Sequence, residues 1–423
     1  MKYLNAKMTI SLGLALRFLI CFWSGNPIDF ETFIRVGYYV NYGVSPTSSR
    51  LPYITGLGQP TYPYLSGLGY LSGWGLLTAI SYKIYSLFPY SRFIYYLLLK
   101  IFPILGDIGS SYIIYKLSIQ LNYPKSQAKK MAINFFLCPI VIIISSLWGM
   151  FDSICVFLIL LSIYLLIKKE IILSSIILAI GTYFKMISII FLPMYIIYLY
   201  ELRNLNDVIK YMSTFIESFM FLALTPLIIF KWSLSEAVIT ILSQTERLGG
   251  VLTIFNILSL LNSLFNEFFS TSFMKSFYLF PLVRYLWVLG VLIAILIFMK
   301  ILNQEPNNCK KIIMGCMFSI LLFLLTRTFI AEQYVMYLLP FLILLDKKKL
   351  YEDIWKLAVI FLFINFYPFT FAYLLNVNLW KIFVKLNQTT PIMHIRLLLR
   401  SIIAFIFDYI LIFNIYKEVK KHV

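Results

Sequence analysis

Apolar runs of about twenty residues recur along the whole chain, and they restrict its fold more than any other feature. A run of about 20 apolar residues is the length an α-helix needs to cross a bilayer. Of the 423 residues, 61% are hydrophobic and 13% charged, and the mean hydropathy is +0.86. Globular chains average about 45–50% apolar and about 25% charged residues, so a soluble fold has too little polar surface to cover this chain. The sequence predicts an all-α polytopic transmembrane helical bundle that forms a single integral membrane domain over residues 1–423.

The formal net charge of +18 comes from 36 basic and 18 acidic residues. The basic residues stand in short clusters between the apolar runs, too short for a patch that follows a nucleic-acid groove. They are typical of orientation signals and of attraction to anionic headgroups. We therefore expect membrane lipid as a partner and no nucleic acid.

Cysteine and histidine give no metal framework. The five cysteines lie mostly within apolar runs without ligand spacing, which indicates small buried hydrophobes. With two histidines, His394 and His422, a histidine-based metal site is not expected. No metal site is predicted, although Asp and Glu side chains are suitable ligands for Mg²⁺ or Mn²⁺.

The basic clusters predict the direction of each crossing, because Lys and Arg collect on the cytoplasmic side. All clusters fall on that side if Thr9–Trp23 is an uncleaved first span and Leu65–Phe88 stays in the outer leaflet. The glycines and serines of Leu65–Phe88 favour this placement, since they make a poor lipid-facing helix. Both termini are then cytoplasmic. The clusters are Lys2 and Lys7, Lys125/Lys129/Lys130, Lys168/Lys169, Arg203/Lys210, Lys310/Lys311, Lys347/Lys348/Lys349 and Lys417/Lys420/Lys421.

About twelve crossings result, with two long stretches on the outer side. These outer loops are residues 24–92, with interfacial helices, and residues 231–275, which include the apolar stretch Val251–Phe265. After the first span, the predicted spans are Phe93–Ile119, Met131–Trp148, Phe151–Ile167, Ile171–Phe184, Met186–Tyr200, Val208–Phe230, Phe277–Ile301, Ile312–Thr326, Ile330–Leu345, Ile354–Leu375 and Ile395–Ile415.

Ionisable residues gather at the outer ends of the predicted spans, and charges at membrane depth are candidates for function. Span ends are also wet, so each charge by itself has a plain structural explanation. Asp29 is the sharpest candidate, because apolar residues recur after it at helical spacing and predict an amphipathic interfacial helix. Asp29 is then the N-cap or a first-turn residue of this helix. Its carboxylate either caps the helix or accepts a proton from a hydroxyl. The outer set comprises Asp29, Glu31, Arg35, Asp152, Lys185, Glu236, Glu246, Arg247, Arg327 and Glu332.

The acidic-aromatic first outer loop, followed by this helix, resembles the GT-C superfamily of polytopic glycosyltransferases. Four further segments are similar to its motifs in order along the chain. An apolar helix bears Asp107, and the outer turn Trp148–Ser153 contains Asp152. Tyr183–Met186 carries Lys185 as in dolichol-phosphate-mannose and dolichol-phosphate-glucose transferases, and Glu332–Tyr334 precedes Leu338–Pro340.

Two positions depart from subfamily patterns. Pro27 stands where one mannosyltransferase branch has the first Asp of Asp-x-Asp, and Ala331 or Glu332 stands where the glucosyltransferase branch has His. The resemblance therefore implies a hexose, mannose or glucose, without choosing between them.

The resemblance implies transfer of the hexose from a polyprenyl-phosphate donor to a glycan or lipid-linked acceptor. Asp29 would be the catalytic base, and Lys185, Arg247 and Arg327 would bind the donor phosphate. A single base and direct displacement imply inversion, and the one-phosphate leaving group makes a divalent metal dispensable. Substrate-binding residues would be Glu31, Asp152, Gln333 and Tyr334. For Asp107 we favour a structural hydrogen bond over substrate contact.

Two other functions compete. A transporter or lipid-linked sugar flippase would carry its charges near the membrane midplane on broken helices in repeated halves. A non-catalytic membrane scaffold would keep its function when the charges of its outer loops are neutralised by substitution. The abundance of Ile, Lys and Tyr is typical of an AT-rich genome such as an archaeal one. The site would then face the cell exterior across the plasma membrane, or the endoplasmic reticulum lumen in a eukaryote.

Overall fold

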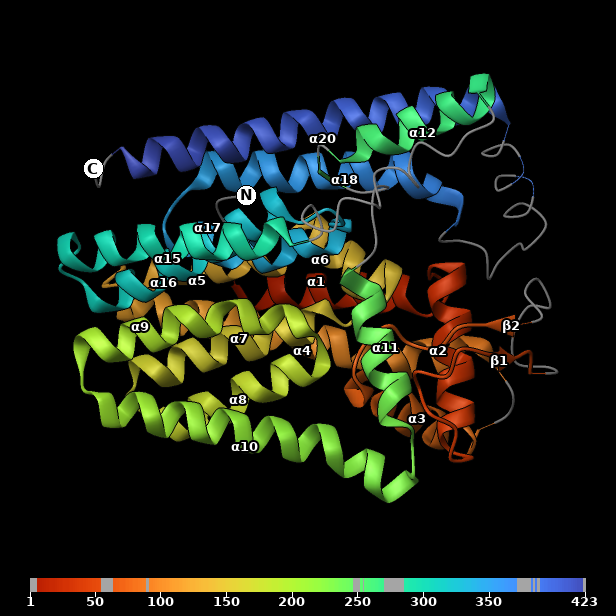
Figure 1. Cartoon of the computed structure of the whole chain (residues 1–423), viewed down its shortest axis with the longest axis horizontal. Helices are drawn as coiled ribbons and strands as arrows, with labels where there is room; N and C mark the ends of the chain where they lie inside the picture. Colours follow the sequence, from red (N-terminus) through yellow and green to blue (C-terminus); the bar gives the residue numbers. More distant parts are fainter. Residues whose placement is uncertain are drawn as a thin grey trace. The chain divides into compact units, whose positions relative to one another are not determined.

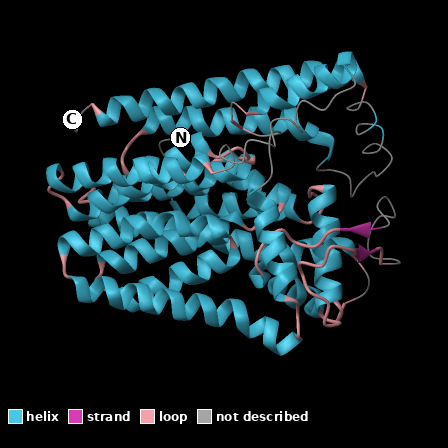
Figure 2. Ribbon diagram, viewed as in Figure 1, coloured by secondary structure: helices cyan, strands magenta, loops and turns pink. Residues whose placement is uncertain are grey.

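The computed structural model describes residues 6–54, 64–88, 91–245, 252–253, 255–269, 285–370, 382, 385 and 389–420. Helices dominate these residues, and one antiparallel pair of two-residue strands, β1 (Leu51–Pro52) and β2 (Tyr64–Leu65), accompanies them (Figure 2). The all-α fold class is confirmed. The chain divides into two compact units: unit 1 is 1–189, 203–244 and 370–376, and unit 2 is 190–202, 245–369 and 377–423.

Unit 1 holds the N-terminal helices. α4, α7, α8 and α10 run along one another, whereas α2 runs across them (Figure 1). Its helices are α1 (Ala6–Cys21), α2 (Pro27–Val40), α3 (Ser72–Tyr85), α4 (Arg92–Gln120), α5 (Lys125–Phe136), α6 (Pro139–Ile142), the π-helix η1 (Ile143–Trp148), α7 (Asp152–Ile167), α8 (Ile171–Phe184), α10 (Leu205–Phe230) and α11 (Leu234–Thr245).

In unit 2, α15 packs against α16, and α12 lies beside α20 (Figure 1). The 3₁₀-helix η2 (Met186–Phe191) spans the boundary between the units. The elements of unit 2 are α9 (Leu192–Leu202), α12 (Asn256–Phe269), α15 (Leu286–Gln304), α16 (Asn308–Thr326), the 3₁₀-helix η3 (Glu332–Tyr337), α17 (Leu339–Leu344), α18 (Lys348–Thr370) and α20 (Thr390–Val419).

Within the described residues, four helices are long and apolar enough to cross a membrane: α4, α10, α15 and α16. A fifth results if α5 and the segment Pro139–Trp148 are counted as one bent span. These helices are consistent with a membrane protein. The predicted twelve crossings, their sidedness and the single integral membrane domain remain predictions.

The predicted span Met131–Trp148 is a pair of helices that meet at a bend and not one unbroken helix. The helix begins earlier, at Lys125, ends at Phe136, and resumes at Pro139 with a bend of 47°. Pro139 has no N–H to donate and disfavours helical geometry at the residue before it, and Cys138 accordingly has an extended backbone (φ −60°, ψ 125°).

Two further predicted spans begin as 3₁₀-helices. Ile330–Leu345 consists of η3 followed by the six-residue α17, and Met186–Tyr200 consists of η2 followed by α9. In both, a proline, Pro340 or Pro193, is the second residue of the following α-helix, where its missing N–H costs nothing. Part of Phe277–Ile301 lies outside the described residues, and its described helix, α15, begins at Leu286.

The segment Leu65–Phe88 forms no long helix. Its helix α3 has 14 residues, about 21 Å at 1.5 Å per residue, against a hydrocarbon core of about 30 Å. The predicted amphipathic helix after Asp29 is present as α2. Its apolar face is buried by protein: Phe33 contacts Trp74 of α3 and Phe30 contacts Tyr96 of α4.

Candidate functional site

Asp29 lies in the first turn of α2, and Asn26 is the N-cap. The Asn26 side chain accepts hydrogen bonds from the backbone N–H groups of Ile28 (3.1 Å) and Asp29 (3.3 Å). The Asp29 carboxylate is partly buried and accepts a hydrogen bond from Trp148 Nε1 at 2.7 Å. Of the two positions predicted for Asp29, N-cap and first turn, the structure shows the first turn.

Trp148 reaches Asp29 because the chain turns sharply at Gly149. Gly149 has φ +86°, and a Cβ there would lie 2.5 Å from the ring of Phe30. Only glycine adopts this left-handed geometry without strain in so little space. The turn sends Trp148 toward α2 and starts α7 at Asp152, three residues after the glycine.

Asp152 and Lys185, predicted as a substrate ligand and a phosphate ligand, form an ion pair with each other. Lys185 Nζ lies 2.6 Å from Asp152 Oδ1, and the side chains are 2% and 0% exposed. The Lys185 ammonium also lies 5.3 Å from the ring centre of Tyr70 and 5.5 Å from that of Phe151. Phe151 stacks on Trp74 at 4.8 Å. Aromatic rings therefore flank the Lys185 ammonium, and the pair is shielded from bulk solvent.

Glu31 and Arg35 form a second buried pair, one turn apart on α2, at 3.8 Å. Arg35 Nη1 also donates to the carbonyl of Leu51 in β1 at 3.1 Å, and the guanidinium lies 5.7 Å from the ring of Tyr53. Burial lowers the pKa of Arg35, and Glu31 opposes this effect. The pair connects α2 to the segment that follows it, so Glu31 has a structural role in addition to its predicted substrate contact.

These residues lie at one end of unit 1. Asp29 is bonded to Trp148 where η1 ends, Asp152 begins α7, and Lys185 directly follows α8. The partner of Asp29 is Trp148, and the partner of Lys185 is Asp152. Only residues 149–151 lie between these two partners along the chain. The structure thus brings Asp152 and Lys185 to the same end of unit 1 as Asp29, which lies more than 100 positions before either of them in the sequence.

Sequence reasoning missed Lys100, a fully buried lysine in α4. Its ammonium donates to the carbonyls of Cys21 (2.8 Å), Ser24 (2.7 Å) and Leu147 (3.3 Å), and to the Ser24 hydroxyl (3.0 Å). It therefore ties the end of α1 to the turn that carries Trp148. The signal that could have found it is its position within the apolar run Phe93–Ile119, well inside the ends of that run.

Asp107 is fully buried in α4 and its carboxylate has three partners. Arg17 Nε lies 3.1 Å away, and the hydroxyls of Ser145 and Ser153 donate at 2.6 and 2.7 Å. This geometry agrees with the structural hydrogen bond favoured for Asp107. Arg17, its partner on α1, was not predicted.

The other predicted residues belong to unit 2. Arg327 directly follows α16, with its guanidinium 5.9 Å from the ring of Phe323. Gln333 is buried in η3, and the ring of Tyr334 lies 6.4 Å from that of Phe323. Arg247 lies outside the described residues.

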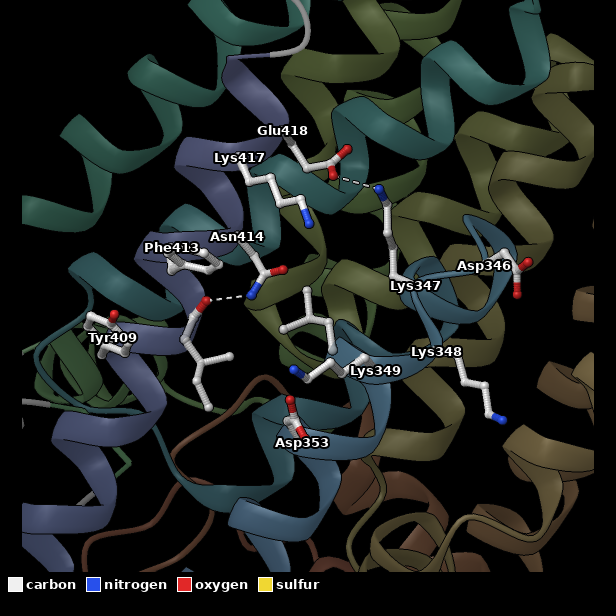
Figure 3. A pocket seen from close by; sticks show the side chains of 12 residues that line it. Asp346, Lys347, Lys348, Lys349, Asp353, Tyr409, Phe413, Asn414, Lys417 and Glu418 are labelled. Carbon is white, nitrogen blue, oxygen red and sulfur yellow. Dashed lines mark hydrogen bonds and ion pairs between the residues drawn. The ribbon is translucent and has the colours of Figure 1, made fainter.

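Unit 2 also has a pocket of about 430 Å³, lined by charged and apolar side chains, where α18 begins and α20 ends (Figure 3). Lys347 is paired with Glu418 at 2.6 Å, and the Asn414 amide donates to the carbonyl of Ile410 at 2.8 Å. Lys349 and Lys417 add positive charge to the lining, and Asp346 and Asp353 add negative charge. The pocket is lined by residues of two predicted cytoplasmic clusters, and none of the predicted site residues lines it.

Among the described residues, no group of three or more His, Cys, Asp or Glu side chains is placed to hold a metal ion. This leaves the predicted lack of a metal site untested. In comparisons with known proteins, no family model matches the chain and no curated protein matches it.

Proposed function

We propose that this protein is a multi-pass membrane glycosyltransferase of the GT-C type. It would cross the membrane about twelve times and transfer a hexose, with inversion, from a polyprenyl-phosphate carrier to a glycan or lipid-linked acceptor. Asp29 would act at the non-cytoplasmic face, either the cell exterior or the endoplasmic reticulum lumen.

The proposal depends most on one observation: Asp29 and the Asp152–Lys185 pair share one end of unit 1. Inverting transfer from a phosphodiester needs a carboxylate to take the acceptor's proton and a cation to stabilise the leaving phosphate. The first is the partly buried, oriented carboxylate of Asp29. The second is the buried ammonium group of Lys185, which Asp152 holds in place at 2.6 Å beside aromatic rings.

The chemistry follows from these groups alone. Asp29 removes the hydroxyl proton of the acceptor as its oxygen attacks the anomeric carbon. The bond from that carbon to the phosphate oxygen breaks on the opposite face, and the lipid phosphate leaves with both electrons. Trp148 orients Asp29, and Lys185 stabilises the negative charge that develops on the phosphate.

The test is Asp29→Asn in purified protein reconstituted with polyprenyl-phosphoryl mannose or glucose and a membrane extract that supplies acceptors. Loss of a general base lowers the rate by roughly 100- to 10,000-fold, so we expect that loss with unchanged folding. Asp207→Asn is the matched control, since Asp207 pairs with Arg203 at the surface start of α10. Full transfer by Asp29→Asn would remove Asp29 as the base.

A specific observation also favours a transporter or flippase of lipid-linked sugars. The buried Arg17–Asp107 pair lies at the middle of α4, and Ser145, just after the helix break at Pro139, bonds to it. Buried charge beside a broken helix is a feature of transporters. Translocation of a fluorescent lipid-linked sugar across vesicles by wild type and Asp29→Asn alike, without transfer, would favour this function.

A further inference from the structure

A groove of about 500 Å³ lies at the surface of unit 1, where α1, α4 and α5 pack against one another. It is open to the surroundings, because Ile10 of α1, Ile108 of α4 and Lys129 of α5 line it and are exposed. α4 is long and apolar enough to cross a membrane, and α5 is the first half of the bent pair that passes the same test. In a membrane, the groove therefore faces lipid.

The groove extends along α4 and α5 away from the short turn, residues 121–124, that joins them. Of its lining residues on these two helices, Tyr115 and Lys129 are nearest to the turn, and Ile108 and Phe136 are farthest from it. At 1.5 Å per residue, the first two lie about 8–9 Å from the turn and the last two about 18–20 Å from it. The groove thus has a lysine at one end and apolar side chains at the other.

The end near the turn is positively charged. Among the described residues that line the groove, none is Asp or Glu, and no ion pair between described residues involves Lys129. A second cation lies beside the lining, since the Lys116 ammonium is 5.2 Å from the ring centre of Tyr112. The hydroxyls of Tyr112 and Tyr115 are hydrogen-bond donors in the same lining. Ammonium and hydroxyl donors together suit the oxygens of a phosphate group.

The far end suits an apolar chain. Ile108 and Phe136 line it, and Ile10 of α1 adds a further aliphatic side chain to the groove. Inside a bilayer, an apolar groove gains little by exchanging one lipid tail for another, because all tails are equally apolar. Preference for one kind of lipid then comes from the charge at the headgroup, while dispersion contacts hold the chain beneath it.

The side of the membrane agrees with this chemistry. Lys129 belongs to the basic cluster Lys125/Lys129/Lys130, which the sequence predicts to be cytoplasmic. Anionic lipids are concentrated in the cytoplasmic leaflet, and basic pockets between membrane helices on that side bind their headgroups.

We propose that the groove binds one anionic phospholipid, with its phosphate on Lys129 and an acyl chain along Ile108 and Phe136. This lipid is distinct from the polyprenyl-phosphate donor, so the site does not depend on the proposed function. It requires that α4 and α5 lie in a membrane.

The headgroup is tested by native mass spectrometry of the purified, delipidated full-length protein. The probes are dioleoyl phosphatidylglycerol, which is anionic, and dioleoyl phosphatidylcholine, which has the same chains and no net charge. Phosphatidylglycerol should bind roughly 10- to 30-fold more tightly, because Lys129 and Lys116 both act on its charge. Lys129→Gln should weaken its binding about five-fold, the effect of one lysine at an anionic headgroup.

The matched control is Lys125→Gln. It removes the same charge from the same exposed cluster, at a position outside the groove lining, and should bind phosphatidylglycerol nearly as wild type does. Equal losses in Lys129→Gln and Lys125→Gln would show attraction to general surface charge and would overturn the site. Equal binding of the two phospholipids by the wild type would overturn the headgroup assignment.

A second pair of variants tests the chain. Ile108→Trp fills the apolar end of the groove and should lose most of the phosphatidylglycerol binding. Leu105→Trp places the same ring one turn earlier on α4, where the side chain is 56% exposed and outside the groove lining, and should bind as wild type. Equal binding by these two variants would overturn the placement of the chain. Size-exclusion profiles and unfolding midpoints establish that each variant is folded.

Two competitors separate the phospholipid from other carriers of phosphate. Glycerol 3-phosphate, which has no acyl chain, should not displace phosphatidylglycerol, and displacement at similar concentrations would show a simple anion site. Polyprenyl phosphate should compete less well than phosphatidylglycerol. Stronger competition by polyprenyl phosphate would assign the groove to the lipid carrier and overturn the phospholipid assignment.

Discussion

At the scale of single residues, the interior of unit 1 is organised by charges that a bilayer would make costly in isolation. Arg17 is satisfied by Asp107 and by the carbonyls of Gly13 (3.3 Å) and Phe136 (2.5 Å). Lys100 is satisfied by backbone carbonyls and the Ser24 hydroxyl. Both cations connect α1 to α4, and Lys100 also holds the turn that carries Trp148, the partner of Asp29.

The Arg17–Asp107 pair distinguishes a structural role from transport. Asp107→Asn leaves the Arg17 guanidinium buried without its carboxylate and should destabilise the protein by about 3–5 kcal/mol, whereas an apolar pair of similar volume is often neutral. We therefore expect Arg17→Met with Asp107→Leu to recover most of the unfolding midpoint in detergent.

If the pair is structural, the double variant should also keep catalytic activity. A folded double variant that has lost translocation of lipid-linked sugar would instead assign the pair to a transport pathway.

At the scale of elements, α10 is the helix whose surroundings matter most for the membrane assignment. In its most apolar window only 11% of the residues are buried inside the protein, against 78% for α16. Phe221, Ile228 and Ile229 are 68%, 73% and 65% exposed. Soluble proteins rarely expose so continuous an apolar surface, and lipid would cover it.

Substitution on α10 tests this. Arginine at the centre of a lipid-facing helix costs about 2.5–3.5 kcal/mol for insertion, and the cost falls toward the helix ends. Phe221→Arg should therefore reduce the amount of membrane-integrated protein strongly, and Leu205→Arg, also exposed but at the first residue of α10, should reduce it little. Equal abundance of both variants in washed membranes would mean that α10 does not face lipid.

At the scale of the whole molecule, the functional proposal needs Asp29 and Lys185 in one compartment. The described contacts place them at one end of unit 1, and the basic clusters predict that this end faces away from the cytoplasm. The turn between α4 and α5 should then lie on the cytoplasmic side.

Cysteine labelling tests the orientation directly, because the five native cysteines are all buried and should give little background. A membrane-impermeant maleimide should label Ser49→Cys, exposed between α2 and β1, in intact cells or sealed vesicles of right-side-out orientation. Ser126→Cys, exposed at the start of α5, should be labelled only after permeabilisation. Labelling of both positions from the same side would contradict the topology and, with it, the shared compartment.

The sequence by itself determined the helical class, most helix positions and the residue types of the candidate site. Apolar periodicity and length are local properties, so α4, α7, α8, α10 and α16 lie close to their predicted bounds. Prolines 139, 193 and 340 were visible too, yet their effect on helix continuity depends on whether neighbours satisfy the freed carbonyls.

Only the tertiary structure decided which charges meet. That Asp152 pairs with Lys185, that Trp148 rather than a helix cap holds Asp29, and that Arg17 and Lys100 fill the interior of unit 1 all follow from packing between helices far apart in sequence. The energy of a charge inside such a bundle is set by the partners within a few ångströms, and the order of residues along the chain does not specify those partners.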